Sequence, residues 1–230
     1  MEENTINILA EYFVDSDQID LGELEIEGVL DMKKFKKLTK LTCSFNSIKK
    51  IVGLSKILEY LDCSNNQLSK LGKLHSCLIY LDCSKNRIKS IDGLADTVRE
   101  LNCSYNELSS LNNLPSDLNK LDCSFNKIKS LDNLPNGLKN LNCSYNLVTN
   151  LNFLPESLEV LICLSNLIKR LDNLPIGLKE LDCSGNHQMN INGTCFPLNM
   201  KKIAFSNNTE ILEGINFTVN GCEIKAGKIL

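Results

Sequence analysis

The chain has 230 residues, of which 43% are hydrophobic, and it carries a net charge of −3. This length is enough for one substantial domain, or two small ones, with a real core. No apolar run reaches the roughly 18 residues of a membrane span, and the N-terminal residues lack the basic and apolar regions of a secretion signal. We therefore expect a soluble, cytoplasmic protein that does not associate with membranes.

Charge is unevenly distributed along the chain. Residues 1–31 contain ten acids and no Lys or Arg, so the remaining residues carry 25 bases and 18 acids, a net charge of +7. A mildly basic body is too weak a signal to indicate a nucleic-acid-binding protein.

The N-terminal segment, residues 1–40, is predicted to form a cap. Ile6, Leu9 and Phe13 recur at helical spacing, which predicts a short amphipathic helix over residues 5–15. Three further apolar residues indicate an irregular first coil: Leu21, Leu24 and Ile26.

A 20-residue repeat organises the chain from Leu41 onward. Eight copies, which begin at Leu41 and then every 20 residues, occupy residues 41–200. Within each copy, positions 1, 8, 11, 14 and 18 are aliphatic, position 3 is Cys and position 6 is Asn; the last copy departs from this pattern at Gln188 and Thr194. One coil cannot bury its own apolar face and must pack on its neighbours, so the pattern predicts a solenoid.

The repeated phrase L-x-x-L-x-C-x-x-N-x-I resembles the leucine-rich repeat family. One copy supplies it with Leu118, Leu121, Cys123, Asn126 and Ile128. The resemblance implies a short parallel strand at positions 20 to 4 of each copy, with positions 1 and 3 in the core. Because side chains alternate along a strand, positions 20, 2 and 4 would face outward and form the concave surface.

Two subtypes of the family are combined in this chain. The segment Ile91 to Leu94 is similar to the intracellular repeats of phosphatase-regulatory subunits, and four Leu-Pro pairs are similar to the repeats of bacterial effector proteins: Leu114-Pro115, Leu134-Pro135, Leu154-Pro155 and Leu174-Pro175. Twenty residues leave little chain for the convex side, and proline favours extended backbone in the residue before it. We expect a convex side of extended segments rather than helices.

The C-terminal segment, residues 201–230, is predicted to form a second cap. Ile215, Phe217 and Val219 alternate with polar residues up to Asn220-Gly221, and Cys222 and Ile224 follow. This pattern predicts a β-hairpin with a type I′ turn.

The cysteines and asparagines of the repeat form two columns. Eight of the 11 cysteines occupy position 3: Cys43, Cys63, Cys83, Cys103, Cys123, Cys143, Cys163 and Cys183. A metal or redox ladder is the alternative to a column of small core side chains, but unpaired Cys is often buried and no C-x-x-C pair occurs. We predict core thiols, no metal site and no cofactor. The Asn column is predicted to satisfy backbone groups of its own coil and of the next coil.

No motif of an enzyme is present. The sequence has no phosphate loop, zinc-protease helix or nucleophile elbow. Effector-type ligases with Leu-Pro repeats place catalysis in a separate domain after the repeats, and only 30 residues follow the last copy here. We therefore predict that the chain is not an enzyme.

One copy breaks the polar pattern of the predicted concave face. Position 2 is elsewhere Asp, Asn or Thr and position 4 is elsewhere Ser, but the copy at Leu161 carries Ile162 and Leu164, preceded by Val160. Position 7 adds Leu147 and Leu167. Exposed apolar clusters with a polar rim usually mark a contact surface, so we predict protein binding here. The alternatives are that the C-terminal cap covers this cluster or that the repeat tolerates the change.

Aromatic residues form two further candidate groups. Tyr60 and Tyr80 occupy position 20 on the predicted concave face, and position 5 carries aromatic residues in four copies: Phe45, Tyr105, Phe125 and Tyr145. Tyr and Phe are enriched in interface cores. At position 5, covering the corner of the next coil is the favoured interpretation.

The resemblance implies a rigid, non-catalytic scaffold whose concave face binds a protein partner. A self-associating structural protein, for example a homodimer formed through the apolar cluster, is the alternative. Nucleic-acid binding is less favoured, because the aspartates of position 2 would repel phosphates; it would use a basic edge formed by Lys49, Lys50, Lys70, Lys89, Lys129, Lys169 and Arg170.

Overall fold

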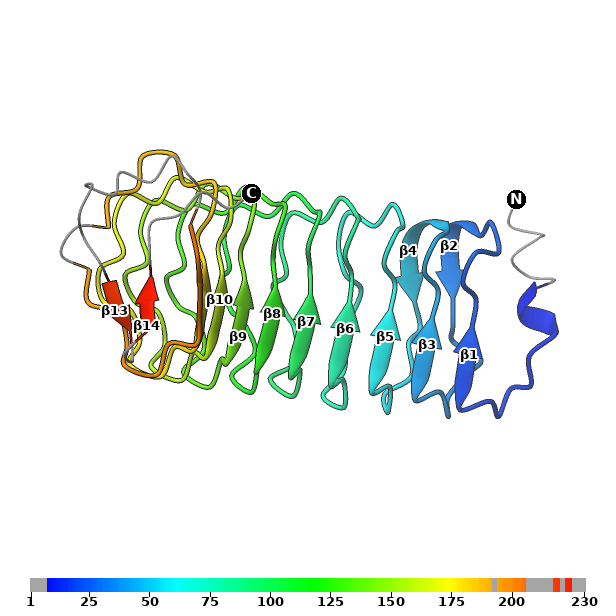
Figure 1. Cartoon of the computed structure of the whole chain (residues 1–230). Helices are drawn as coiled ribbons and strands as arrows, with labels where there is room; N and C mark the ends of the chain where they lie inside the picture. Colours follow the sequence, from blue (N-terminus) through cyan, green and yellow to red (C-terminus); the bar gives the residue numbers. More distant parts are fainter. Residues whose placement is uncertain (1–7, 192–193, 206–216, 220–221, 225–230) are drawn as a thin grey trace.

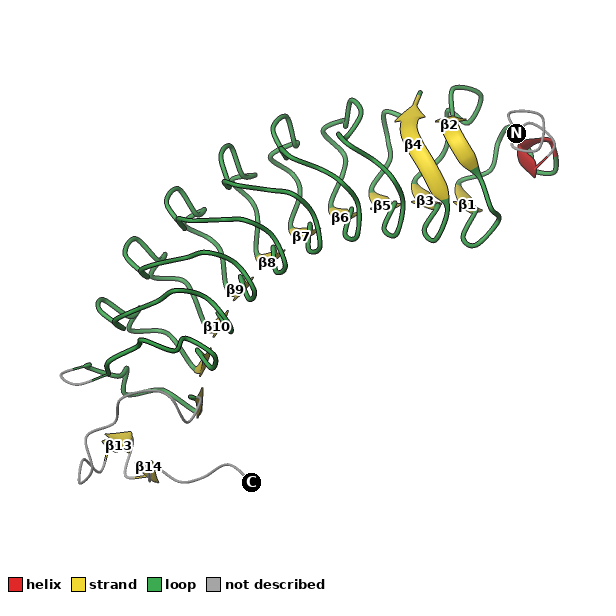
Figure 2. Cartoon of the chain, turned by 90° about the horizontal axis from the view of Figure 1, so that it is seen from above, coloured by secondary structure: helices red, strands yellow, loops and turns green. Residues whose placement is uncertain are grey.

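The protein folds as a parallel β-solenoid that bends into an open arc (Figures 1 and 2). The structure is a computed structural model that describes residues 8–191, 194–205, 217–219 and 222–224. Ten short strands form one parallel sheet in the order β1-β3-β5-β6-β7-β8-β9-β10-β11-β12. Figure 2 shows this sheet along the concave side of the arc.

Each coil contributes one strand of three residues to this sheet. The strands are β1 (Gln18–Asp20), β3 (Lys40–Thr42), β5 (Tyr60–Asp62), β6 (Tyr80–Asp82), β7 (Glu100–Asn102), β8 (Lys120–Asp122), β9 (Asn140–Asn142), β10 (Val160–Ile162), β11 (Glu180–Asp182) and β12 (Lys202–Ala204). The strands thus span positions 20 to 2 of each copy, two residues fewer than the sequence predicts. Backbone bonds between coils nevertheless continue beyond them, from Cys103 N to Asp122 O at 2.8 Å and from Tyr105 N to Ser124 O at 2.9 Å.

The repeat length is 20 in the middle of the solenoid and 22 at both ends. Leu101 pairs with Leu121, whereas Gln18 pairs with Lys40 and Glu180 pairs with Lys202. The last coil is therefore longer than the copy assigned from sequence. Its core places are filled by Met189 and Met200, while Leu198, which the 20-residue spacing would bury, is exposed.

The convex side consists of turns and extended segments, as predicted. At the N-terminal end, β2 (Glu27–Asp31) pairs in parallel with β4 (Ser47–Val52). In the coils with Leu-Pro pairs a tight turn replaces any helix, closed for example by a bond from Leu118 N to Pro115 O at 3.2 Å. The prediction of a solenoid with a non-helical convex side is confirmed.

The core is built from the apolar columns of the repeat. In the copy at Leu121, the side chains of Leu121, Cys123, Ile128 and Leu131 are all at most 1% exposed. Burial of each aliphatic side chain contributes roughly 1.5–3 kcal/mol to stability. Because the apolar face of one coil packs on its neighbours, each coil is stabilised by the coils on either side. The cysteine column lies in this core, as predicted.

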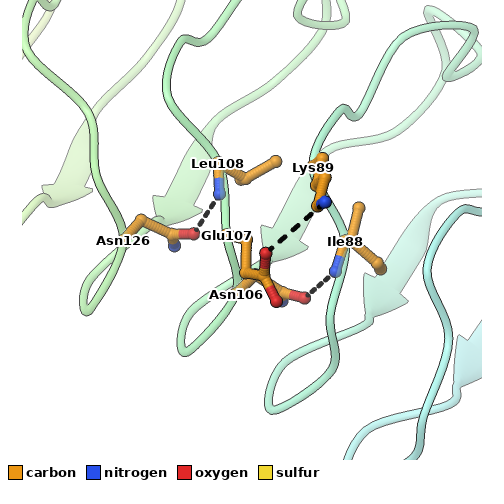
Figure 3. A network of polar contacts seen from close by, with 6 residues as sticks. All are labelled: Ile88, Lys89, Asn106, Glu107, Leu108 and Asn126. Carbon is orange, nitrogen blue, oxygen red and sulfur yellow. Dashed lines mark hydrogen bonds and ion pairs between the residues drawn. The ribbon is translucent and has the colours of Figure 1, made fainter.

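The asparagine column holds adjacent coils together. Figure 3 shows Asn106 Oδ1 accepting a hydrogen bond from the backbone N of Ile88, on the preceding coil, at 2.9 Å. Asn106 Nδ2 donates to the carbonyl oxygens of Cys83 on that coil, at 3.0 Å, and of Cys103 and Ser104 on its own coil, each at 3.1 Å. The predicted structural role is confirmed, but the prediction of the next coil was wrong: besides its own coil, each Asn binds the coil before it.

The ends of the chain differ from the repeats. Among the described residues helix is found at 8–10, and Phe13 is 86% exposed, so the helix predicted over residues 5–15 ends early. Lys34 Nζ donates to Leu9 O within this helix at 2.7 Å. Ile6 and Ile215 lie outside the described residues. Near the C-terminus, β13 (Phe217–Val219) and β14 (Cys222–Ile224) pair antiparallel, and the predicted turn residues between them lie outside the described residues.

Candidate functional site

The polar residues of position 2 on the concave face are bound to the backbone. Asp122 Oδ1 accepts hydrogen bonds from Ser124 N at 2.9 Å and from Ser124 Oγ at 2.7 Å. The same bond from the position 4 amide to the position 2 side chain occurs at Asp62, Asp82, Asn102, Asn142 and Asp182. This Asx turn shapes the end of each strand. The polar residues of position 2 therefore have a structural role.

The serines of position 4 are almost fully buried in this arrangement. Ser124 and Ser144 are each 4% exposed, although the strand alternation predicts an outward position. The small side chain fits between the Asx turn and the neighbouring coil. The outward surface of the concave sheet is therefore made mainly by positions 20 and 2.

The copy at Leu161 replaces both members of this pair with apolar residues. Ile162 offers no acceptor, and the amide of Leu164 donates instead to Ser144 Oγ on the preceding coil at 3.3 Å. Ile162 and Leu164 are half-buried, as is Val160 at the start of β10. In the sheet, Ile162 is flanked by Asn142 and Asp182.

Two leucines at position 7 extend this apolar surface beyond the strand. Leu147 is 40% exposed and Leu167 is 54% exposed, and they occupy equivalent places on adjacent coils. We refer to Val160, Ile162, Leu164, Leu147 and Leu167 as the apolar patch.

Three aromatic residues of position 5 stack into a ladder beside the patch. The ring centroids of Tyr105 and Phe125 are 3.9 Å apart, and those of Phe125 and Tyr145 are 4.1 Å apart. All three residues have φ between 52° and 54°, a left-handed conformation that L residues adopt at a cost. The amide of Tyr145 donates to the carbonyl of Leu164 at 2.8 Å, so this ring ladder ends next to the apolar patch.

The remaining aromatic candidates lie apart from this ladder. Tyr60 and Tyr80 stack on β5 and β6 with ring centroids 4.4 Å apart, and Lys40 Nζ lies 4.8 Å from the Tyr60 ring centroid. Burial, followed by the charge of Asp62, raises the pKa of Tyr60. Phe45 is separated from the ladder by two coils that carry no ring at position 5. Apart from Phe45, the predicted site residues thus form two groups, on β5–β6 and around β7–β10.

The buried thiols have the character of core side chains. Desolvation raises the pKa of Cys143 to about 12, and burial also raises the pKa of Cys123. The ten cysteines whose side chains are described are all free, and among the described residues no group of three His, Cys, Asp or Glu side chains could hold a metal ion. A thiol with a raised pKa is a poor nucleophile at neutral pH.

The basic edge is interrupted by acids. Figure 3 shows Lys89 Nζ 3.9 Å from Glu107 Oε2 on the next coil. Arg170 Nε lies 3.1 Å from Asp172 Oδ2. These ion pairs reduce the positive charge that the edge presents to solvent.

The fold and the repeat are shared with known structures. YopM from Yersinia enterocolitica WA-314 is similar at 30% identity and a TM-score of 0.60, over 76% of this chain and 45% of YopM. A Shigella effector leucine-rich repeat domain is similar at 22% identity and a TM-score of 0.60, over 90% of this chain and 86% of that domain. The chain is a leucine-rich repeat protein. It spans less than half of the YopM chain.

A third leucine-rich repeat structure comes from Listeria monocytogenes. The functional domain of InlJ, described as including a cysteine ladder, is 24% identical with a TM-score of 0.52, over 84% of this chain and 54% of InlJ. No protein-family model and no curated protein matches the sequence of this leucine-rich repeat protein. In the described part of the chain, no helix has the length and apolar character needed to cross a membrane.

Sequence reasoning missed the Asx turns and the stacking of the ring ladder. The Asp-x-Ser and Asn-x-Ser spacing, repeated at positions 2 and 4, was the available signal for the turns. The stacking carried no comparable signal, because it requires the left-handed backbone at position 5.

Proposed function

We propose that this leucine-rich repeat protein is a non-catalytic scaffold that binds a protein partner through its concave face. Leucine-rich repeat folds generally mediate protein–protein interaction. The observation that carries the proposal is the change at Ile162 and Leu164, which replaces a hydrogen-bonded polar pair with apolar side chains on the concave side.

The energetics of the apolar patch favour a contact surface. The change removes an Asx turn that six other copies make, and Leu147 and Leu167 of the same patch are substantially exposed. Burial of each aliphatic side chain by a partner would contribute up to roughly 1.5–3 kcal/mol. The polar rim of Asn142 and Asp182 resembles that of other protein interfaces.

The partner is a protein other than this chain in our proposal, and a second copy is the alternative. Nucleic acid fits the concave face poorly, because Asp62, Asp82 and Asp122 would repel phosphates there. We also propose a cytoplasmic location, since the described thiols are free and a reducing compartment would keep them so.

A regularised variant tests the proposal. Ile162→Asp with Leu164→Ser converts the odd copy to Leu-Asp-Cys-Ser, the phrase found at residues 121–124, and should restore the Asx turn without harm to the fold. The matched control is Ile176→Asp with Leu198→Ser, because both residues are exposed and lie outside the sheet.

Light scattering over a concentration series and affinity capture from cell extract distinguish the outcomes. We expect the wild type and the control to be monomers and to capture the same partner protein from the extract. The regularised variant should no longer capture this partner. A wild-type dimer that the regularised variant abolishes would assign the patch to a second copy. Equal retention by all three proteins would overturn the proposal.

A further inference from the structure

The ring ladder stops at Tyr145 although the backbone that supports it continues. Position 5 of the next two copies is Ser165 and Gly185. Ser165 has φ 49°, close to the 54° of Tyr145. The amide of Ser165 donates to Ser184 O at 2.8 Å, the same bond that Tyr145 makes to Leu164. The coil at Ser165 thus has the ladder conformation without the ring.

The two ends of the ladder differ. At the N-terminal end, Lys85 Nζ lies 5.9 Å from the ring centroid of Tyr105. At the C-terminal end, Tyr145 is 47% exposed, and among the described residues no ring or cation lies over the face that points away from Phe125. Within the described part of the chain, this aromatic face therefore has no stacking partner.

The space over Ser165 is bordered by apolar side chains. Leu164 precedes Ser165, and Leu147 and Leu167 follow the ladder position on their own coils. A Cβ atom at Gly185 would lie 2.7 Å from Ser165 Oγ, so position 5 of that coil packs closely on Ser165 and accepts no side chain without a shift. Position 5 of these two coils thus carries at most a hydroxymethyl group, where the first three ladder coils carry rings.

We propose that an aromatic side chain of the protein partner stacks on Tyr145 above Ser165 and continues the ring ladder. The inference rests on the proposed function and names the chemical group that the partner supplies. Internal ring spacings of 3.9 and 4.1 Å show that the backbone sets a stacking distance at this position. An aromatic ring fits better than a guanidinium group, because Leu147, Leu164 and Leu167 provide no carboxylate to pair with a charge.

Methyl-labelled protein and small probes test the inference by NMR. The probe is N-acetyl-tryptophanamide, compared with N-acetyl-leucinamide and N-acetyl-argininamide. We expect saturable shifts of the methyl groups of Leu147, Leu164 and Leu167, with affinity for the tryptophan probe about fivefold higher than for the other two. Because the chain has no Trp, the fluorescence of the same probe provides a second titration.

Three variants give the decisive comparison. Ser165→Phe should occupy the space in cis and lower the affinity for the tryptophan probe about fivefold, whereas Ser165→Ala should leave it unchanged. Phe45 and Phe125 show that position 5 accepts this residue. Tyr145→Leu removes the stacking face and should lower the affinity for the tryptophan probe to the same degree. This result does not depend on whether Ser165→Phe folds.

The outcomes separate this inference from the proposed function. Equal binding of the tryptophan probe to wild type, Ser165→Phe and Tyr145→Leu, or a preference for the arginine probe, would overturn the aromatic site. The concave-face proposal would stand in that case if the regularised variant still lost its partner. It would fall if that variant retained the partner, whatever the probe does.

Discussion

The side-chain amide of Asn66 donates a hydrogen bond to the carbonyl oxygen of Cys43 on the preceding coil at 2.9 Å. The same contact recurs at Asn86, Asn106, Asn126, Asn146, Asn166 and Asn186. Each of these asparagines, buried or half-buried, thereby binds its coil to the one before it.

Removal of one amide from the column should weaken the whole solenoid. Asn146→Ala leaves three carbonyl groups without their side-chain donor and the amide of Ile128 without its acceptor. We expect a loss of about 2–4 kcal/mol in the free energy of unfolding, because buried groups left unsatisfied cost 1–3 kcal/mol each and some will bind water. Urea unfolding measures this loss. Asn136→Ala, at an exposed turn, should change stability by less than about 0.5 kcal/mol.

The Asx turn predicts different effects for two substitutions at one residue. Asp122→Asn keeps the acceptor for Ser124, as Asn102 and Asn142 do, so stability should change by less than about 0.5 kcal/mol. Asp122→Ala removes the acceptor and should cost about 1 kcal/mol. Thermal unfolding of both variants checks the difference; equal losses would show that the charge, or the bond that Asp122 Oδ2 accepts from Asn142 Nδ2 at 3.0 Å, and not the turn, matters at this position.

Substitutions at two glycines with similar φ distinguish the cost of backbone strain from the cost of steric overlap. Gly53 has φ 70°, and a Cβ atom there would lie 2.7 Å from the backbone N of Lys33; Gly93 has φ 83° and nothing within 4 Å. Gly93→Ala should cost about 1–2 kcal/mol, the usual penalty for a left-handed L residue. Gly53→Ala should cost more, since the neighbouring coil must also move. Equal costs in urea unfolding would exclude a steric contribution.

The cysteine column should resist alkylation in the folded state. With iodoacetamide at pH 8, followed by mass spectrometry, we expect Cys195, which is exposed, to react and Cys123 and Cys143 to remain unmodified. Burial raises the pKa of both core thiols, so the reactive thiolate is not available. Rapid modification of the column would mean that the coils open readily; unfolding in urea provides the positive control.

The same thiols predict a loss of stability at alkaline pH. The pKa of Cys143 is about 12 in the folded state and about 8.5 when unfolded, so its contribution is complete below pH 8.5 and falls as pH rises above it. At pH 10 the Cys143 thiol should favour unfolding by about 2 kcal/mol, and the raised pKa of Cys123 acts in the same direction.

Urea unfolding at pH 7, 9 and 10 under reducing conditions measures this dependence on pH. Cys123→Ala should lose less stability between pH 7 and 10 than the wild type, by the contribution of one thiol. An identical pH dependence in the two proteins would show that the buried thiols do not cause the loss of stability at alkaline pH.

The repeat made most of the fold predictable, because its period fixes which side chains are buried whatever the details of the turns. The apolar columns and the Asn column follow from it directly. The length of the last coil could also have been predicted from the proline spacing: Pro197 follows Pro175 by 22 residues, as β12 follows β11.

The arrangement of the candidate site was less accessible from sequence. The position of Tyr145 beside Leu164 depends on backbone bonds between coils, and ring stacking depends on a left-handed conformation that Tyr and Phe rarely adopt. Phe13 illustrates the opposite error: helical spacing suggested burial, but the helix ends before this residue and leaves it in solvent.

Each asparagine of the column binds the coil before it, and this direction has a consequence for synthesis of the chain. Because Asn126 supplies the acceptor for the amide of Leu108 and a donor for the carbonyl of Cys103, the coil that begins at Leu101 is incomplete until residues of the next copy have left the ribosome. Each newly emerged copy therefore completes its predecessor, and a nascent solenoid always ends in one coil with unsatisfied backbone groups, whatever its length.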